Sequence, residues 1–256
     1  MSSPPVDSGL WCRRFHPAPQ AGRRLVCFPH AGGSASFYHP VSAALSPGVD
    51  VLAVQYPGRQ DRRQEPTVDD IGHLADRIAE ALEGWTDRPL TFFGHSMGSL
   101  VAFEVARRLE HGPNGPVRLF ASGRRAPSAH RDEQVHRRDD DGIIAELRAL
   151  SGTDARVLQD EELLRMVLPA VRSDYTAVET YRADPGAAVR CPVTVLVGDS
   201  DPKTSLDEAW AWEGHTTGGF DLRTFPGGHF YLADRQAEVL DVLRDHFTSA
   251  ASQCQA

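Results

Sequence analysis

The chain alternates between short apolar runs and longer stretches in which apolar residues recur every three to four positions. The apolar runs have the length and the composition of buried strands, and they cover residues 23–28, 51–55, 90–93, 117–122 and 192–197. A last strand is predicted at residues 221–225. The periodic stretches have the spacing of amphipathic helices, most clearly over residues 71–82, 97–110 and 232–247. This alternation predicts an α/β fold, in which a mostly parallel sheet is flanked by helices on both faces.

The alternation is interrupted between the predicted strands at residues 117–122 and 192–197. Amphipathic helical spacing without any strand signal fills residues 124–189, and Pro169 is expected to bend one of these helices. We interpret this insertion as a lid over the carboxyl edge of the sheet, with additional core helices as the alternative. Residues 1–22 are rich in Pro, Ser and Gly and are predicted to be a loose lead-in. One domain is therefore expected over residues 23–250.

The apolar run at residues 90–93 ends in Gly94-His95-Ser96-Met97-Gly98, and a helical pattern begins at once. In this context Gly-x-Ser-x-Gly forms a nucleophile elbow, a tight turn that presents the serine at the carboxyl end of a strand. The glycines leave space where a Cβ atom would strike neighbouring backbone. The following helix directs its free N–H groups toward whatever the serine attacks. Ser96 is therefore the candidate nucleophile.

A serine hydroxyl is a poor nucleophile at neutral pH, so it needs a histidine base, which in turn needs a carboxylate to hold its tautomer. Of the 11 histidines, His229 follows the last predicted strand and two glycines, a turn that suits such a base. The candidate acids near this region are Asp199, Asp201, Asp207 and Asp221. We favour Asp201, which lies three residues past Gly198 and can turn toward His229, and we expect Asp199 to cap the loop. The chain order Ser, Asp, His is that of α/β-hydrolase triads.

Several motifs in this order resemble those of type II thioesterases, the stand-alone editing hydrolases of polyketide and non-ribosomal peptide synthases. The resemblance extends from about Leu25 to Phe247. It rests on the serine elbow and on four further segments, Phe28-Pro29-His30-Ala31-Gly32-Gly33, Tyr56-Pro57-Gly58-Arg59, Leu168-Pro169-Ala170-Val171-Arg172-Ser173-Asp174-Tyr175 and Gly227-Gly228-His229. The family has the α/β-hydrolase fold, so the resemblance implies that fold with a helical lid inserted between late strands.

By position, the resemblance implies Ser96 as nucleophile, Asp201 as acid and His229 as base. It also implies that the backbone N–H groups of Ala31 and Met97 form the oxyanion hole. The glycine-rich turn around Ala31 is where such hydrolases build one half of that hole. The implied substrate is an acyl group on the phosphopantetheine thiol of an acyl or peptidyl carrier protein, and no cofactor is implied.

Net charge, apolar run length and cysteine spacing argue against several other classes of protein. The formal net charge of −8 over 256 residues argues against a nucleic-acid-binding surface. No apolar run approaches the roughly 18 residues that a membrane span requires, and the first residues do not resemble a signal peptide. The four cysteines are scattered, which favours core packing over a metal site. We therefore expect a cytoplasmic protein without a membrane anchor, and a monomer.

Two groups of arginines are candidates for docking an acidic carrier protein, Arg59 with Arg62 and Arg63, and Arg124 with Arg125, Arg131, Arg137 and Arg138. A solvated charged loop is the alternative for the second group, because acidic residues are interleaved with its arginines.

Other functions use the same residues. A general carboxylesterase would need the same triad, and a catalytically silent hydrolase fold could bind a synthase without reacting. A cyclising type I thioesterase is disfavoured because no carrier domain is recognised ahead of the hydrolase.

Overall fold

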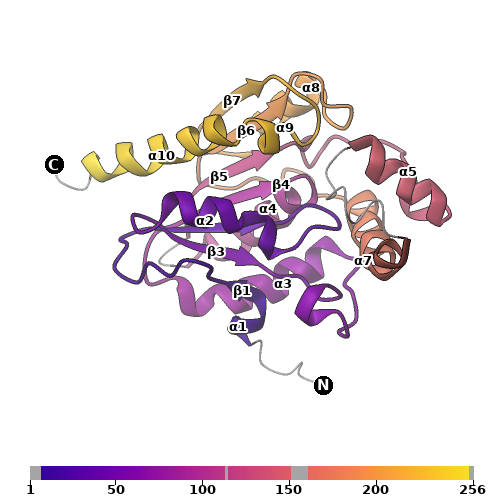
Figure 1. Ribbon diagram of the computed structural model, residues 1–256. Helices are drawn as coiled ribbons and strands as arrows, with labels where there is room; N and C mark the ends of the chain where they lie inside the picture. Colours follow the sequence, from indigo (N-terminus) through magenta and orange to yellow (C-terminus); the bar gives the residue numbers. More distant parts are fainter. Residues whose placement is uncertain (1–6, 113–114, 151–160, 254–256) are drawn as a thin grey trace.

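The computed structural model describes residues 7–112, 115–150 and 161–253. Its centre is a seven-stranded sheet with the strand order β1-β3-β2-β4-β5-β6-β7 (Figure 1). The strands are β1 (Cys12–Arg13), β2 (Arg24–Phe28), β3 (Asp50–Val54), β4 (Leu90–His95), β5 (Pro116–Ser122), β6 (Val193–Gly198) and β7 (Phe220–Phe225). Every neighbouring pair is parallel except β1 with β3, so the predicted class of a mostly parallel α/β sheet is confirmed.

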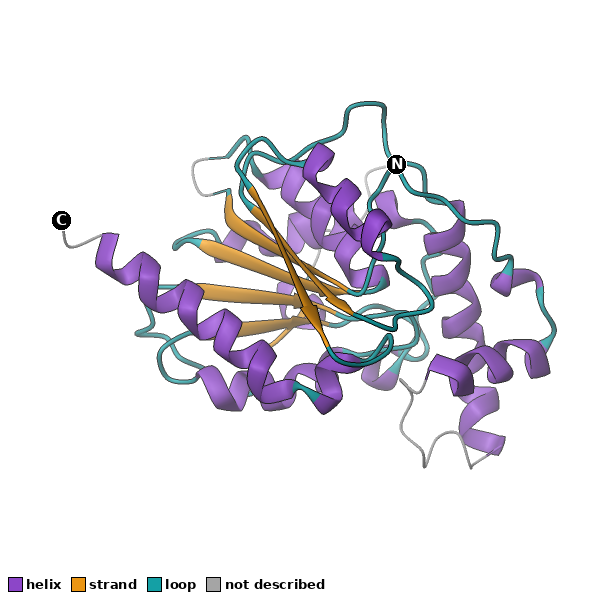
Figure 2. Cartoon of the chain, turned by 90° about the horizontal axis from the view of Figure 1, so that it is seen from above, coloured by secondary structure: helices purple, strands orange, loops and turns teal. Residues whose placement is uncertain are grey.

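Helices cover both faces of the sheet (Figure 2). The α-helices within the described residues are α1 (Ser8–Trp11), α2 (His39–Leu45), α3 (Ile71–Leu82), α4 (Met97–Leu109), α5 (Asp140–Leu150), α7 (Glu161–Thr180), α8 (Leu206–Trp210), α9 (Tyr231–Asp234) and α10 (Gln236–Gln253). Short 3-10 helices lie at η1 (Ala35–Tyr38), η2 (Gln60–Arg62), η3 (Glu83–Trp85), η4 (Val135–Arg137) and η5 (Ala211–His215). None of these helices combines the length and the apolar character needed to cross a bilayer.

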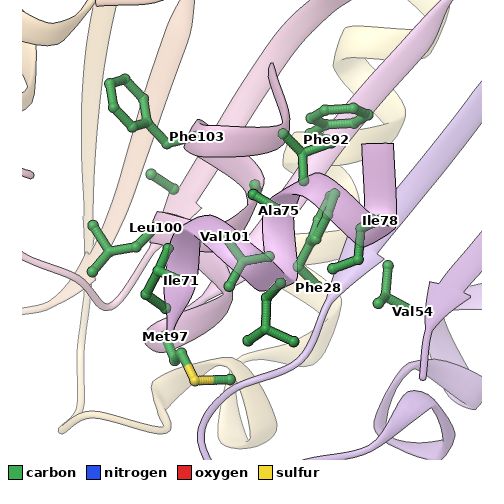
Figure 3. Packing of buried hydrophobic residues seen from close by; sticks show 14 of the residues in the cluster. Phe28, Val54, Ile71, Ala75, Ile78, Phe92, Met97, Leu100, Val101 and Phe103 are labelled. Carbon is green, nitrogen blue, oxygen red and sulfur yellow. The ribbon is translucent and has the colours of Figure 1, made fainter. Parts of the chain in front are cut away.

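The hydrophobic core consists of two clusters, one on each face of the sheet. Successive side chains of a strand point to opposite faces, so Phe92 joins one cluster and Phe93 the other. Phe92 packs with Ile78 of α3 and Val101 of α4 (Figure 3). Phe93 belongs to the cluster that includes Leu240 of α10. The central strands are therefore buried on both sides, which accounts for their continuous apolar sequences.

The expectation of a loose lead-in over residues 1–22 is wrong for its described part. A helical turn at α1 leads into β1, which pairs antiparallel with β3 and places Cys12 opposite Val54. Trp11 is buried, and the guanidinium carbon of Arg62 lies 4.3 Å from the centroid of its ring. A strand of two residues is too short to produce a periodic signal, so the pattern missed it. Residues 1–6 lie outside the described residues.

The sequence pattern also missed α2, the helix between β2 and β3. Two parallel neighbours need a crossover connection, and η1 with α2 provides it. The helix has only seven residues, and its segment begins with His39 and Pro40, so its apolar face spans fewer than two full turns.

The helices predicted between two late strands are present between β5 and β6. The segment contains η4, α5 and α7, and α7 continues through Pro169. Within this insertion the Glu179 carboxylate of α7 accepts hydrogen bonds from the backbone N–H groups of Val135 and His136, at 2.9 and 3.1 Å. Residues 151–160 of the predicted insertion lie outside the described residues. Figures 1 and 2 show α5 and α7 together at one end of the sheet.

The substitution Gly98→Ala tests the closest backbone approach in this fold. A Cβ atom at Gly98 would lie 2.0 Å from the carbonyl oxygen of Phe28, and backbone on both sides cannot rotate away. We expect the free energy of unfolding to fall by about 3 kcal/mol, as measured by urea titration. The matched control is Gly84→Ala, since a Cβ atom there meets nothing within 4 Å. Equal stability of the two variants would show that the elbow tolerates a side chain.

Candidate active site

Ser96 lies in a strained turn between β4 and α4. Its φ and ψ angles are 53° and −120°, a conformation that non-glycine residues rarely adopt. The turn persists because Ser96 donates its backbone N–H to the carbonyl oxygen of Ser122, at 2.8 Å. The flanking positions have no room for a side chain, since a Cβ atom at Gly94 would lie 2.2 Å from the Gly98 oxygen. The structure therefore has the geometry of the predicted nucleophile elbow.

His229 and Asp201 approach Ser96 in the order that general-base activation requires. His229 Nε2 lies 3.0 Å from Ser96 Oγ, and His229 Nδ1 lies 2.9 and 3.0 Å from the two carboxylate oxygens of Asp201. Asp201 Oδ1 also accepts the backbone N–H of Lys203 at 2.7 Å. His229 and Asp201 are both buried. The three side chains that the sequence proposed separately thus form one hydrogen-bonded chain.

Asp199 occupies the capping position that we predicted for it. Its Oδ1 accepts the backbone N–H of Gly227 at 3.1 Å and the hydroxyl of Ser200 at 3.0 Å. The Gly227 N–H is the main reason that the pKa of this carboxyl lies below its usual value. Asp221 pairs with Arg223 on β7, and Asp207 lies in the first turn of α8. Among the four candidates, Asp201 is the one that contacts His229.

Two further histidines lie beside the triad and remain neutral. Burial lowers the pKa of His30 to about 3, and it lowers the pKa of His95 well below its ordinary value. His95 Nδ1 lies 2.9 Å from Ser122 Oγ, and its ring centroid lies 5.2 Å from that of His229. Because neither ring takes up a proton near neutral pH, they do not place a second positive charge beside a protonated His229.

The two predicted oxyanion donors come from different segments near Ser96. Met97 is the first residue of α4, so its N–H has no acceptor within the helix. Ala31 lies in the glycine-rich loop after β2 and lines the same small pocket as Ser96 and His229. The loop is closed by a hydrogen bond from Gly33 N to His30 O, at 2.9 Å.

Side chains of the inserted helices cover Ser96. Leu147 and Leu150 of α5 and Tyr175 of α7 line the pocket at the nucleophile, whose volume is about 20 Å³. A larger hollow of about 800 Å³ lies next to it, between the glycine-rich loop and α7, and the two share His30 and Leu147. The sequence placed an insertion over the sheet edge, but it did not indicate which of its residues face the serine.

The two arginine groups do not form the exposed basic patches that we expected. Arg59, Arg62, Arg124 and Arg125 are all buried. The paired carboxylates are Asp174 for Arg59, Glu65 for Arg62, Glu133 for Arg125, Glu208 for Arg131 and Glu146 for Arg138. Buried and paired guanidinium groups contribute little field at the surface, so most of these residues cannot steer a partner.

Arg59 and Asp174 lie in two of the segments that resemble the family, but neither was predicted to act beside the triad. The structure pairs them beside the glycine-rich loop. The described residues contain no group of three or more His, Cys, Asp or Glu side chains that could hold a metal ion.

Residues 23–247 match the model of the thioesterase domain family. The probable cadicidin biosynthesis thioesterase of Streptomyces griseus is 60% identical over 87% of this chain, but the match spans only 62% of that relative's length. Thioesterase PikA5 of Streptomyces venezuelae is 56% identical over 94% of this chain and 86% of its own. The type II thioesterase BorB, from the borrelidin biosynthetic cluster, superposes with a TM-score of 0.88 and 50% identity, over 96% of this chain and all of its own. This chain belongs to the thioesterase domain family, and the type II thioesterase resemblance that its motifs predicted is confirmed.

Proposed function

We propose that this protein hydrolyses acyl thioesters on the phosphopantetheine arm of acyl or peptidyl carrier proteins, and so releases stalled or misprimed groups from a polyketide or non-ribosomal peptide synthase. The observation that carries the proposal is the hydrogen-bonded chain of Ser96, His229 and Asp201 beneath the inserted helices. The proposal includes residues 23–250 as the catalytic domain, acting as a cytoplasmic monomer without a cofactor.

In the first half of the reaction, Ser96 Oγ attacks the thioester carbonyl carbon while His229 Nε2 takes the hydroxyl proton. Asp201 holds the proton on His229 Nδ1, so that Nε2 is free to act as a base. The carbonyl oxygen becomes an oxyanion and accepts hydrogen bonds from the Ala31 and Met97 N–H groups. The tetrahedral intermediate then breaks its C–S bond, and His229 donates its proton to the departing sulfur.

In the second half, water replaces the thiol. His229 takes a proton from the water as its oxygen attacks the acyl ester on Ser96, and the same two N–H groups bind the second oxyanion. Breaking the C–O bond returns the proton to Ser96 and releases a free carboxylic acid.

The lid has to open before the acyl group enters. A space of about 20 Å³ beside Ser96 has room for about one water molecule and none for an acyl chain with its pantetheine arm. Leu147 and Leu150 of α5 close this space from one side, and Tyr175 of α7 closes it as well. We infer that α5 and α7 separate from the glycine-rich loop to admit the pantetheine arm.

The substrate class is tested by comparing an acyl carrier thioester with an oxygen ester of the same acyl group. We expect kcat/KM to be higher for the carrier thioester, because thiolates leave more readily and the carrier adds contacts to the enzyme. The measurement is release of the free acid under matched conditions. Preference for the oxygen ester would indicate the rival function, a general carboxylesterase.

Replacement of the nucleophile, Ser96→Ala, should remove nearly all turnover, because the acyl-enzyme forms on that oxygen. The expected loss in kcat is on the order of a millionfold, measured with the carrier thioester. Circular dichroism should show an unchanged fold, since the alanine leaves the turn backbone intact. A variant that retains a few per cent of wild-type kcat would exclude the covalent route.

Two isosteric substitutions separate the acid from its neighbour. Asp201→Asn should lower kcat by about ten-thousandfold, because an amide cannot hold the required tautomer of His229. Asp199→Asn is the matched control, two residues earlier in the same loop, and should change kcat much less because the Asp199 carboxylate accepts hydrogen bonds from Gly227 and Ser200 and not from His229. If the two variants ranked in the opposite order, the acid would be Asp199.

A further inference from the structure

A buried ion pair ties the inserted helix α7 to the loop that carries the Ala31 N–H. Arg59 Nη1 and Nη2 donate to the two carboxylate oxygens of Asp174 at 2.6 and 2.8 Å. The same Asp174 Oδ2 accepts the backbone N–H of Gly32 at 2.7 Å, and Arg59 Nη1 also donates to the Gly33 carbonyl oxygen at 3.1 Å. The two charged groups therefore hold together three segments that are far apart in the chain: the Tyr56-Pro57-Gly58-Arg59 segment, the glycine-rich loop and α7.

We propose that Arg59 and Asp174 are positioning residues, which fix the direction of the Ala31 N–H and make it depend on the placement of α7. The proposal rests on the proposed function, because it takes that N–H as an oxyanion donor.

The direction of this N–H follows from the geometry of one peptide unit. The Ala31 N–H and the His30 carbonyl belong to the same planar trans peptide, so they point in opposite directions. The His30 carbonyl accepts the Gly33 N–H, with Gly32 at φ 75°, and this is the arrangement of a turn that needs glycine at its third residue. Whatever holds Gly32 and Gly33 in this turn therefore also aims the Ala31 N–H.

The ion pair is suited to that task because it is almost fully desolvated. Asp174 is 0% exposed and Arg59 is 8% exposed. The Asp174 carboxylate, the largest favourable contribution, raises the pKa of Arg59 against the effect of burial. Bidentate pairs of this kind have a single geometry, and breaking one leaves an uncompensated charge in the interior. Neither side chain has the freedom that a surface pair has, so the loop they hold is rigid.

Helix α7 touches the loop at a second point, one turn away from Asp174. A Cβ atom at Gly32 would lie 3.0 Å from Val171 Cγ2, so α7 packs directly against the turn. A displacement of α7 moves both Val171 and Asp174 and releases Gly32. The Ala31 N–H thus points into the oxyanion hole only when α7 is packed against the glycine-rich loop. When the lid is open, Ser96 lacks one of the two oxyanion donors.

The test separates positioning from stability by removing both charges together. The double variant Arg59→Met/Asp174→Leu replaces the pair with apolar side chains of similar size, and such exchanges often preserve stability. It leaves Gly32 and Gly33 without their partners. We expect kcat for the carrier thioester to fall on the order of 100-fold, with KM changed less than about threefold. Affinity for an alkyl boronic acid, which forms an anionic tetrahedral adduct on serine, should fall in parallel.

Glu179→Gln is the matched control, because Glu179 is another carboxylate on α7 whose side chain is only 5% exposed, and it accepts backbone N–H groups away from the glycine-rich loop. It should retain kcat within about threefold. Should the double variant unfold, Arg59→Lys keeps the charge beside Asp174 but cannot span both Asp174 and Gly33, and kcat should still fall about tenfold.

Either of two results overturns the proposal: wild-type kcat in the folded double variant or in Arg59→Lys, or an equal loss of kcat in Glu179→Gln. Failure of the proposed function would be distinct, because the wild-type protein itself would then not hydrolyse the thioester.

Discussion

The contact between Gly98 and the backbone of Phe28 is the constraint on which the site depends. A Cβ atom at Gly98 would lie only 2.0 Å from the Phe28 oxygen, so the first turn of α4 rests directly on the end of β2. The hydroxyl of Tyr38 donates to that same oxygen at 2.8 Å and holds it in place. Because the glycine-rich loop begins just after Phe28, this contact brings the loop beside Ser96. Two segments separated by about one quarter of the chain thus meet beside the nucleophile.

Similar side chains in the site act differently because their surroundings and their partners differ. His30 and His95 lie near His229, yet desolvation keeps both of them neutral, whereas His229 has Asp201 as a hydrogen-bond partner on Nδ1. The same principle sorts the arginines. Arg59 is buried with Asp174 and holds backbone, while Arg63 remains exposed at the rim of the large hollow. In this protein the role of a charged side chain follows from the groups that it contacts, and the sequence alone does not show those contacts.

The sequence predicted the sheet and the triad because both leave local signals. Strands buried on both faces appear as apolar runs, and Ser96 and Asp201 each follow such a run at the carboxyl edge, while His229 follows the edge strand β7. The edge strand at Cys12 and the seven-residue helix α2 were too short for periodicity to detect. Arg59 and Asp174 are 115 positions apart, so their pairing has no local signal. The burial of the arginines could not be predicted for the same reason, because the sequence does not show which carboxylate pairs with which arginine.

The small volume at Ser96 has a consequence for how substrates are chosen. The space of about 20 Å³ beside Ser96 has no room for an acyl chain, so cleavage has to wait for α5 and α7 to separate. If separation of α5 and α7 is the slow step, an acyl group is cleaved in proportion to the time its carrier waits at the entrance. Chains that move on quickly to the next synthase module then escape, whereas chains that have stopped do not. Selectivity of this kind depends on how long the carrier stays at the entrance and not on the shape of the acyl group. One hydrolase can therefore release acyl groups of many different shapes.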